Sequence, residues 1–335
     1  MSGVASAPSA PSARNPWLTA TAWRRLFRDR PILPLLALLA LLVALSELVR
    51  PGIVNPNWAG FILRTAVPLA ILAGCQTLTM LTGGIDLSVG AVASGSGFLV
   101  ATLVGDQGLA VAILAAVVVA SLAGLLTGIG VGVFRVHPLI MTLGMGLVVF
   151  GLANWWQLVM VQTGGGTPDE LRWIGSGSFM GIVPHSLLVF VPLALVILVG
   201  LRRTGYGRLL YAIGDNPVAA RLSGARAWQV IVLLYVISAV MAAIAGFLVS
   251  GLTNVASVTL ADSYVLPSVA AAVIGGTSIM GGRGGYGGTI VGALILTVII
   301  SLLSSLGYPE AVRQVLFGAI IVTVAAAYTR ITAES

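Results

Sequence analysis

Residues 81–90 read LTGGIDLSVG, and a long apolar run lies on each side of them, at 58–81 and at 87–104. About 20 apolar residues are enough to cross the hydrocarbon core of a bilayer as one helix. Asp86 therefore lies between two segments of spanning length, although a charge at the bilayer centre costs roughly 2.5–3.5 kcal/mol on insertion scales. The stretch predicts an all-α membrane protein in which the chain breaks at a polar, glycine-rich turn.

The composition of the whole chain agrees with this prediction. Of its 335 residues, 58% are hydrophobic, 42 are glycine and only 8% are charged, whereas soluble domains are about a quarter charged. All 17 basic residues are arginine, which excludes the lysine of a phosphate-binding loop or a Schiff-base site. One cysteine and two separated histidines argue against a zinc site. We expect no cofactor, no metal, no enzymatic activity and an external energy source.

On the 20-residue template the chain contains ten candidate spans. They are 32–49, 58–81, 87–104, 109–134, 138–161, 183–201, 228–251, 265–280, 287–306 and 312–328. The eighth is short and flanked by glycine, which predicts a re-entrant or broken segment and eight or nine full crossings as the alternative. Ten spans divide into five plus five, and an odd number in each half predicts an inverted repeat. The pairs Gly83-Gly84 and Gly275-Gly276 are a weak echo of such a repeat.

The arginines predict the orientation. With residues 1–30 as a flexible cytoplasmic tail and 31–335 as one transmembrane domain, thirteen arginines fall inside and three outside, which favours both termini in the cytoplasm. The outer three are Arg50, Arg172 and Arg313, and Arg64 lies near an outer span end. The formal net charge of +7 is spread along the chain, so we expect no nucleic-acid partner.

Two compatible interpretations of the break at 83–88 are open. In the first, Gly83 or Gly84 ends one helix in the left-handed conformation, and Asp86 or Ser88 accepts from the N–H groups that open the next. In the second, the break lines a substrate path or gate, because irregular backbone at membrane depth lines a cavity or the protein interior. The candidate pathway or gate residues are Gly83, Gly84, Asp86, Ser88, Gly275, Gly276 and Thr277.

The longest polar stretch expected on the cytoplasmic side is 202–227, with five arginines. Its simplest interpretation is retention on that side. Within it, 214–224 reads GDNPVAARLSG, which predicts a short helix capped by Asp215 or Asn216, with Pro217 first and Gly224 as the stop. Such a helix would expose small side chains to a partner groove, and we therefore favour a docking element. The small side chains are those of Ala219, Ala220 and Ser223.

The predicted span interiors hold few ionisable groups. Ion-coupled carriers usually need acids or histidines inside the membrane as relays, so this scarcity disfavours a secondary transporter and suggests an uncharged substrate. A membrane-embedded enzyme would need a nucleophile and a base held by an orienting network. Asp86, Ser88 and His137 are the nearest candidates, and the sequence around them offers no such network.

Three blocks together resemble a known family. They are 82–90, the stretch 211–224 beginning YAIGDN, and 271–282 with IGGTS at its centre. With these blocks the chain resembles the membrane-spanning permease subunits of bacterial ABC importers for ribose-type monosaccharides, over about residues 32–328. Related permeases carry branched-chain amino acids, nucleosides or an autoinducer.

The resemblance implies a fold similar to the ten-helix importer class that includes the vitamin B12 permease. It implies a bacterial inner-membrane protein that moves a neutral sugar such as ribose, xylose or galactose from periplasm to cytoplasm. The implied partners are a second permease copy or homologue, two cytoplasmic ATPase subunits or a fused double ATPase, a periplasmic sugar-binding protein and membrane lipid. The implied ATPase-coupling residues are Asp215, Asn216, Ala219, Ala220, Arg221 and Gly224.

Overall fold

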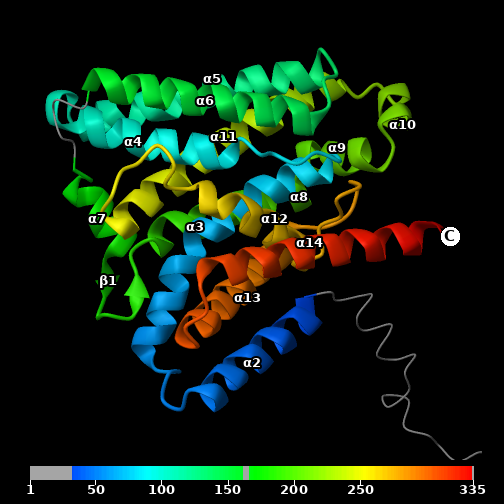
Figure 1. Ribbon diagram of the computed structural model, residues 1–335. Coiled ribbons are helices and arrows are strands. Elements are labelled where there is room, and N and C mark those ends of the chain that lie inside the picture. Colours follow the sequence, from blue (N-terminus) through cyan, green and yellow to red (C-terminus); the bar gives the residue numbers. More distant parts are fainter. Residues whose placement is uncertain (1–31, 161–165, 334–335) are drawn as a thin grey trace, which may run out of the picture.

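The computed structural model describes residues 32–160 and 166–333, and in that part the chain is a bundle of α-helices (Figure 1). The predicted N-terminal tail lies outside the described residues. The long helices are α2 (Ile32–Val49), α3 (Pro56–Leu81), α4 (Val89–Gln107), α5 (Leu109–Gly132), α6 (Pro138–Met160), α8 (Leu187–Arg203), α11 (Ala227–Thr253), α13 (Tyr286–Ser305) and α14 (Glu310–Ala333). The short ones are α7 (Asp169–Ser176), α9 (Gly205–Asp215), α10 (Pro217–Leu222), α12 (Val265–Ile274) and the 3-10 helix η3 (Asp262–Tyr264).

Seven helices in the described part are long and apolar enough to cross a membrane: α2, α3, α4, α5, α6, α11 and α13. The pair α8 and α9, bent by 67°, gives an eighth if it forms one span. Their bend lies at Thr204, which has an extended backbone. Its side-chain Oγ1 caps α9 by accepting the N–H of Gly207 at 3.1 Å. The expectation of an all-α membrane protein is confirmed, whereas the ten spans and the five-plus-five repeat stay predictions.

Two of the expected spans differ from the structure. The eighth, 265–280, is a helix only as far as Ile274 and then becomes turns, so the alternative of a broken segment is the correct one. The sixth, 183–201, begins instead with a two-stranded antiparallel hairpin, β1 (Ser178–Phe179) and β2 (Val183–Pro184), and its helix starts at Leu187. The residue before a proline favours extended backbone, which agrees with Val183 lying in a strand and not in the helix.

Helices α3 and α11 form the centre of the bundle, and close glycine contacts bring α5 against α11. A Cβ at Gly124 would lie 2.5 Å from the carbonyl oxygen of Tyr235, and one at Gly128 would lie 2.6 Å from Cα of Val232. In a bilayer helices attract mainly through such close packing, because burial in lipid already satisfies apolar side chains. Outer helices differ: α2 buries only Ser46.

The two ends of α3 contact different parts of the molecule. Its first turns lie against the hairpin, where a Cβ at Gly60 would be 2.6 Å from the carbonyl oxygen of Ile182. Its last residue, Leu81, lies against α9 and the loop after α12. Since 26 residues extend about 39 Å as a helix, the hairpin and the α9–α10 segment lie at opposite ends of the bundle (Figure 1).

Candidate functional site

The break after α3 is a helix cap built from two glycines. Gly83 has a left-handed backbone, with φ +77°. Its N–H donates to Met80 O at 2.9 Å, and the N–H of Gly84 donates to Thr79 O at 3.0 Å. These two bonds are those of the Schellman motif, which pairs the carbonyls left free at the end of a helix. The prediction that Gly83 or Gly84 ends the helix in the left-handed conformation is therefore confirmed.

Asp86 lies buried beneath this cap, with 2% of its surface exposed. Its Oδ1 accepts from the N–H of Ser88 at 3.0 Å and from the Ser88 hydroxyl at 2.5 Å, and its Oδ2 accepts from the hydroxyl of Ser238 on α11 at 2.9 Å. These bonds offset the cost of burying the carboxylate. The carboxylate thus accepts the N–H of Ser88, the residue before α4, but neither the Asp86 nor the Ser88 side chain accepts an N–H of the first turn of α4, so this part of the capping prediction is wrong.

The residues that hold Asp86 were not singled out by the sequence. The side-chain amide of Gln76 on α3 donates to Asp86 O at 2.7 Å and accepts the N–H of Asp86 at 3.1 Å. Thr142 on α6 accepts the N–H of Leu87 and donates to Ile85 O, both at 3.1 Å. Their one signal, shared with Ser238, is that each is a polar residue inside a long apolar run, where a polar side chain needs a partner.

The second glycine pair repeats the cap at the end of α12. Gly276 has φ +86°, its N–H donates to Val273 O at 2.9 Å, and the N–H of Thr277 donates to Ala272 O at 3.0 Å. The spacing of both bonds equals that at the end of α3. Thr277 Oγ1 lies 3.4 Å from Thr289 Oγ1 of α13, so this break is fixed to the start of the following helix.

The capped helix predicted within residues 202–227 is present as α10. The Oδ1 atom of Asn216 accepts the N–H groups of Val218 at 3.0 Å and Ala219 at 2.9 Å, and Pro217 occupies the first turn. Gly224 ends the helix with φ +84°. Asn216 is therefore the cap, whereas Asp215 is the last residue of α9.

One expectation for α10 is wrong. Ala220 is not exposed but 6% accessible, because it packs in the hydrophobic core of the bundle. Ala219, Arg221, Ser223 and Gly224 are exposed. So are two larger apolar side chains, with Val218 57% and Leu222 85% accessible. The surface that α10 offers is thus more apolar than the small-residue surface expected.

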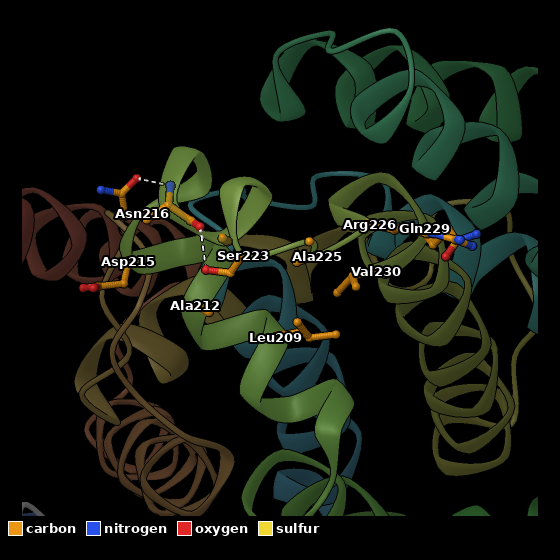
Figure 2. Close-up of a pocket in the computed structure, with 12 residues that line it drawn as sticks. Leu209, Ala212, Asp215, Asn216, Ser223, Ala225, Arg226, Gln229 and Val230 are labelled. Carbon is orange, nitrogen blue, oxygen red and sulfur yellow. Dashed lines mark hydrogen bonds between the residues drawn. The ribbon is translucent and has the colours of Figure 1, made fainter.

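A groove of about 620 Å³ lies beside α10. Figure 2 shows it between the α9–α10 turn, which carries Asp215 and Asn216, and the start of α11, which carries Gln229 and Val230. Leu209 and Ala212 of α9 contribute apolar lining, and Arg226 and Asp215 contribute charge at opposite ends. A groove flanked by a short rigid helix is a surface to which a partner helix or loop can dock.

The two breaks and the α9–α10 segment meet at one point. The N–H of Gly282, in the loop after α12, donates to Leu81 O at 3.0 Å. Gly214 of α9 packs against both residues, since a Cβ there would overlap Leu81 O and lie 2.5 Å from Gly282 N. Tyr211 of α9 donates its hydroxyl to Gly284 O at 2.9 Å. The structure therefore brings the candidate coupling residues next to the candidate gate residues.

A family model described as branched-chain amino acid transport system / permease component matches residues 59–325. The chain belongs to this permease family. The permease is 33% identical to the ribose import permease protein RbsC of Escherichia coli K12 over 295 residues, which cover 85% of this chain and 88% of that protein. It is 35% identical to RbsC of Bacillus subtilis, with 83% and 87% covered, and 30% identical to the fructose import permease protein FrcC of Rhizobium meliloti, with 87% and 82% covered.

Membership in this family identifies the chain as a multi-pass, non-catalytic subunit of an ABC importer. The resemblance read from blocks 82–90, 211–224 and 271–282 is thereby confirmed. In the permease, these three blocks form the α3 cap, the α9–α10 segment and the α12 cap, which are the parts that lie together.

Proposed function

We propose that this permease carries a neutral monosaccharide from periplasm to cytoplasm. The support comes from its relatives, whose names specify ribose and fructose, and a further one, from Escherichia coli K12, is a galactofuranose transporter permease with 34% identity. The scarcity of ionisable residues in the spanning helices agrees with an uncharged substrate. Asp86, the buried acid between α3 and α4, uses both carboxylate oxygens for hydrogen bonds from Ser88 and Ser238.

The energy for transport would come from ATPase subunits that dock on the α9–α10 segment. The observation that carries this proposal is the capped helix α10 beside its groove. A loop that served only to retain the chain on one side would not need both an Asn216 cap and a Gly224 stop. Asp215, Asn216, Ala219, Arg221 and Gly224 would then contact the ATPase, while the buried Ala220 would support the helix from below.

In this proposal the permease lies in the bacterial inner membrane, and the α9–α10 segment and both termini lie in the cytoplasm. The excess of arginine on that side supports this orientation. The hairpin at the other end of α3 would then face the periplasm, where a sugar-binding protein delivers its cargo. The assembly would contain two ATPase subunits or a fused double ATPase, and a second permease copy or homologue. The five-plus-five repeat and the vitamin B12-type fold are part of the same proposal.

Uptake into proteoliposomes tests the proposal directly. The permease would be reconstituted with and without its co-purified ATPase and binding protein, and given labelled ribose, xylose, galactose, fructose, leucine or adenosine. We expect uptake of one of the sugars that requires ATP and both partners. Uptake of leucine or adenosine under the same conditions would overturn the sugar assignment, and uptake by the permease alone, driven by an ion gradient, would overturn the ABC mechanism.

A further inference from the structure

The contact between α9 and the end of α3 is made by backbone atoms. At Gly214, a Cβ would overlap the carbonyl oxygen of Leu81, so only glycine allows the two helices to approach this closely. Gly214 has an ordinary helical backbone and precedes Asp215, the last residue of α9. Its requirement for glycine therefore arises from the space between the helices and not from its own conformation.

The loop after α12 closes the same contact from the other side. Gly281 has φ +94°, and a Cβ there would lie 2.8 Å from Gly214 O and 3.1 Å from Gly83 N. The next residue, Gly282, donates its N–H to Leu81 O at 3.0 Å. Three segments far apart in the sequence thus touch through glycine: the end of α3, the end of α9 and the loop 275–285.

The hydrogen bond from Gly282 has a structural consequence. The last four carbonyls of a helix have no partner within the helix, and Gly282 supplies one for Leu81. If the loop moved away from α3 alone, the Leu81 carbonyl would lose its partner at a cost in free energy. The end of α3 and the loop are therefore expected to move together.

Tyr211 provides a second link between α9 and the loop. Its hydroxyl donates to Gly284 O at 2.9 Å. A second tyrosine on the same helix, Tyr206, donates in the same way to Val230 O at 3.1 Å, but Val230 belongs to α11. The two tyrosines form a matched pair, because each makes one hydroxyl bond to a backbone carbonyl and only that of Tyr211 reaches the loop.

We propose that Gly214 and Tyr211 are positioning residues that transmit movement of the α9–α10 segment to both breaks at once. Because packed interiors shift between discrete arrangements and do not deform continuously, a displacement of α9 must carry Leu81 and the loop 281–284 with it. This inference rests on the proposed docking of ATPase subunits on α10. It adds the route by which their movement reaches the α3 and α12 caps.

The test uses a reporter thiol in the loop. Met280 lies just before Gly281 and is 65% accessible, whereas the native Cys75 is fully buried. The variant Met280→Cys would be placed in the complete complex with ATPase and binding protein in proteoliposomes. The measurement is the rate of labelling by a polar maleimide with and without Mg-ATP, together with the rate of ATP hydrolysis. We expect ATP to change the labelling rate when Tyr211 and Gly214 are intact.

Tyr211→Phe in this background should reduce the ATP-dependent change in labelling, roughly two- to tenfold, as the loss of one hydrogen bond implies. ATP hydrolysis should continue, so that hydrolysis is uncoupled from the movement of the loop. Tyr206→Phe should keep the full change. Gly214→Ala should reduce the ATP-dependent change in labelling further than Tyr211→Phe does. Size-exclusion chromatography of the Gly214→Ala complex reports whether the complex has assembled.

The outcomes separate the inference from the function on which it rests. If ATP changes the labelling of the parent complex and Tyr211→Phe keeps that change in full, the transmission route is wrong while the proposed function stands. An equal loss in Tyr206→Phe and Tyr211→Phe would also overturn the route, because it would show a general effect on α9. If ATP does not change the labelling of a parent complex that takes up sugar, the route is also wrong and the proposed function stands. If the parent complex takes up no sugar with ATP and both partners present, the proposed function fails and the inference fails with it.

Discussion

Oδ2 of Asp86 accepts a hydrogen bond from the hydroxyl of Ser238 at 2.9 Å, although 152 residues separate the two in the sequence. Both side chains are buried, with 2% and 0% of their surfaces exposed. The bond ties the segment between α3 and α4 to the middle of α11. This acid is therefore a structural junction between three helices, and its contribution can be measured.

Asp86→Ala is expected to impair assembly. The substitution leaves the hydroxyl groups of Ser88 and Ser238 without their acceptor in a buried place, at a cost of about 1–3 kcal/mol for each unsatisfied group. The measurement is the yield and Tm of the detergent-solubilised permease. Asp106→Ala, an exposed acid near the end of α4, is the control and should keep both values. A normal Tm with loss of uptake would instead favour the gate interpretation of Asp86.

Ser238→Ala tests the same junction from the other side. It removes one hydrogen bond to a charged acceptor, which is worth about 1.5–3 kcal/mol. Combined with Asp86→Ala, the two effects should fall short of their sum by about 0.5–3 kcal/mol, because each substitution removes the same bond. Tm values of both single variants and of the double variant give this coupling. Strict additivity would show that the bond contributes nothing.

Two helical glycines should respond oppositely to alanine. A Cβ at Gly128 would lie 2.6 Å from Cα of Val232, whereas Gly144 on α6 has open space within 4 Å. Gly128→Ala should push α5 away from α11 and lower the Tm by an amount equivalent to about 1–3 kcal/mol. Gly144→Ala should leave the Tm unchanged or raise it by an amount equivalent to at most about 1 kcal/mol of stability, because alanine favours a helix over glycine. Equal responses would show that close packing at Gly128 contributes little.

Leu222→Asp tests the docking surface at α10. Leu222 is 85% accessible, and a leucine of this kind that becomes buried in an interface contributes about 1.5–3 kcal/mol. The substitution should weaken ATPase binding roughly ten- to a hundredfold, with the Tm of the isolated permease unchanged. Co-purification and titration of the ATPase measure the effect. Met180→Asp, on the fully exposed hairpin tip at the other end of α3, should bind the ATPase as the unaltered protein does.

Much of the molecule follows from local features of the sequence. Runs of apolar residues predict the long helices, because a segment in lipid must pair its backbone N–H and C=O groups with one another. Gly83 and Gly224 end helices, and Asn216 caps one, because each of these roles depends on the chain within a few residues. The three blocks that identify the family are also short, contiguous stretches, so the sequence alone shows them. Local sequence thus determined the helical class, the caps, the short helix α10 and the permease family.

The tertiary structure decided how these parts meet. The sequence predicts that the small residue Ala220 is exposed, but in the structure it packs in the hydrophobic core. The span predicted at 183–201 starts with a hairpin instead, since Ser178 and Phe179 pair with Pro184 and Val183. Nothing local to Asp86 specifies Ser238, and nothing local to Gly214 specifies Leu81. Such partners are fixed by the packing of helices, which depends on the shape of whole surfaces and not on any short stretch of the chain.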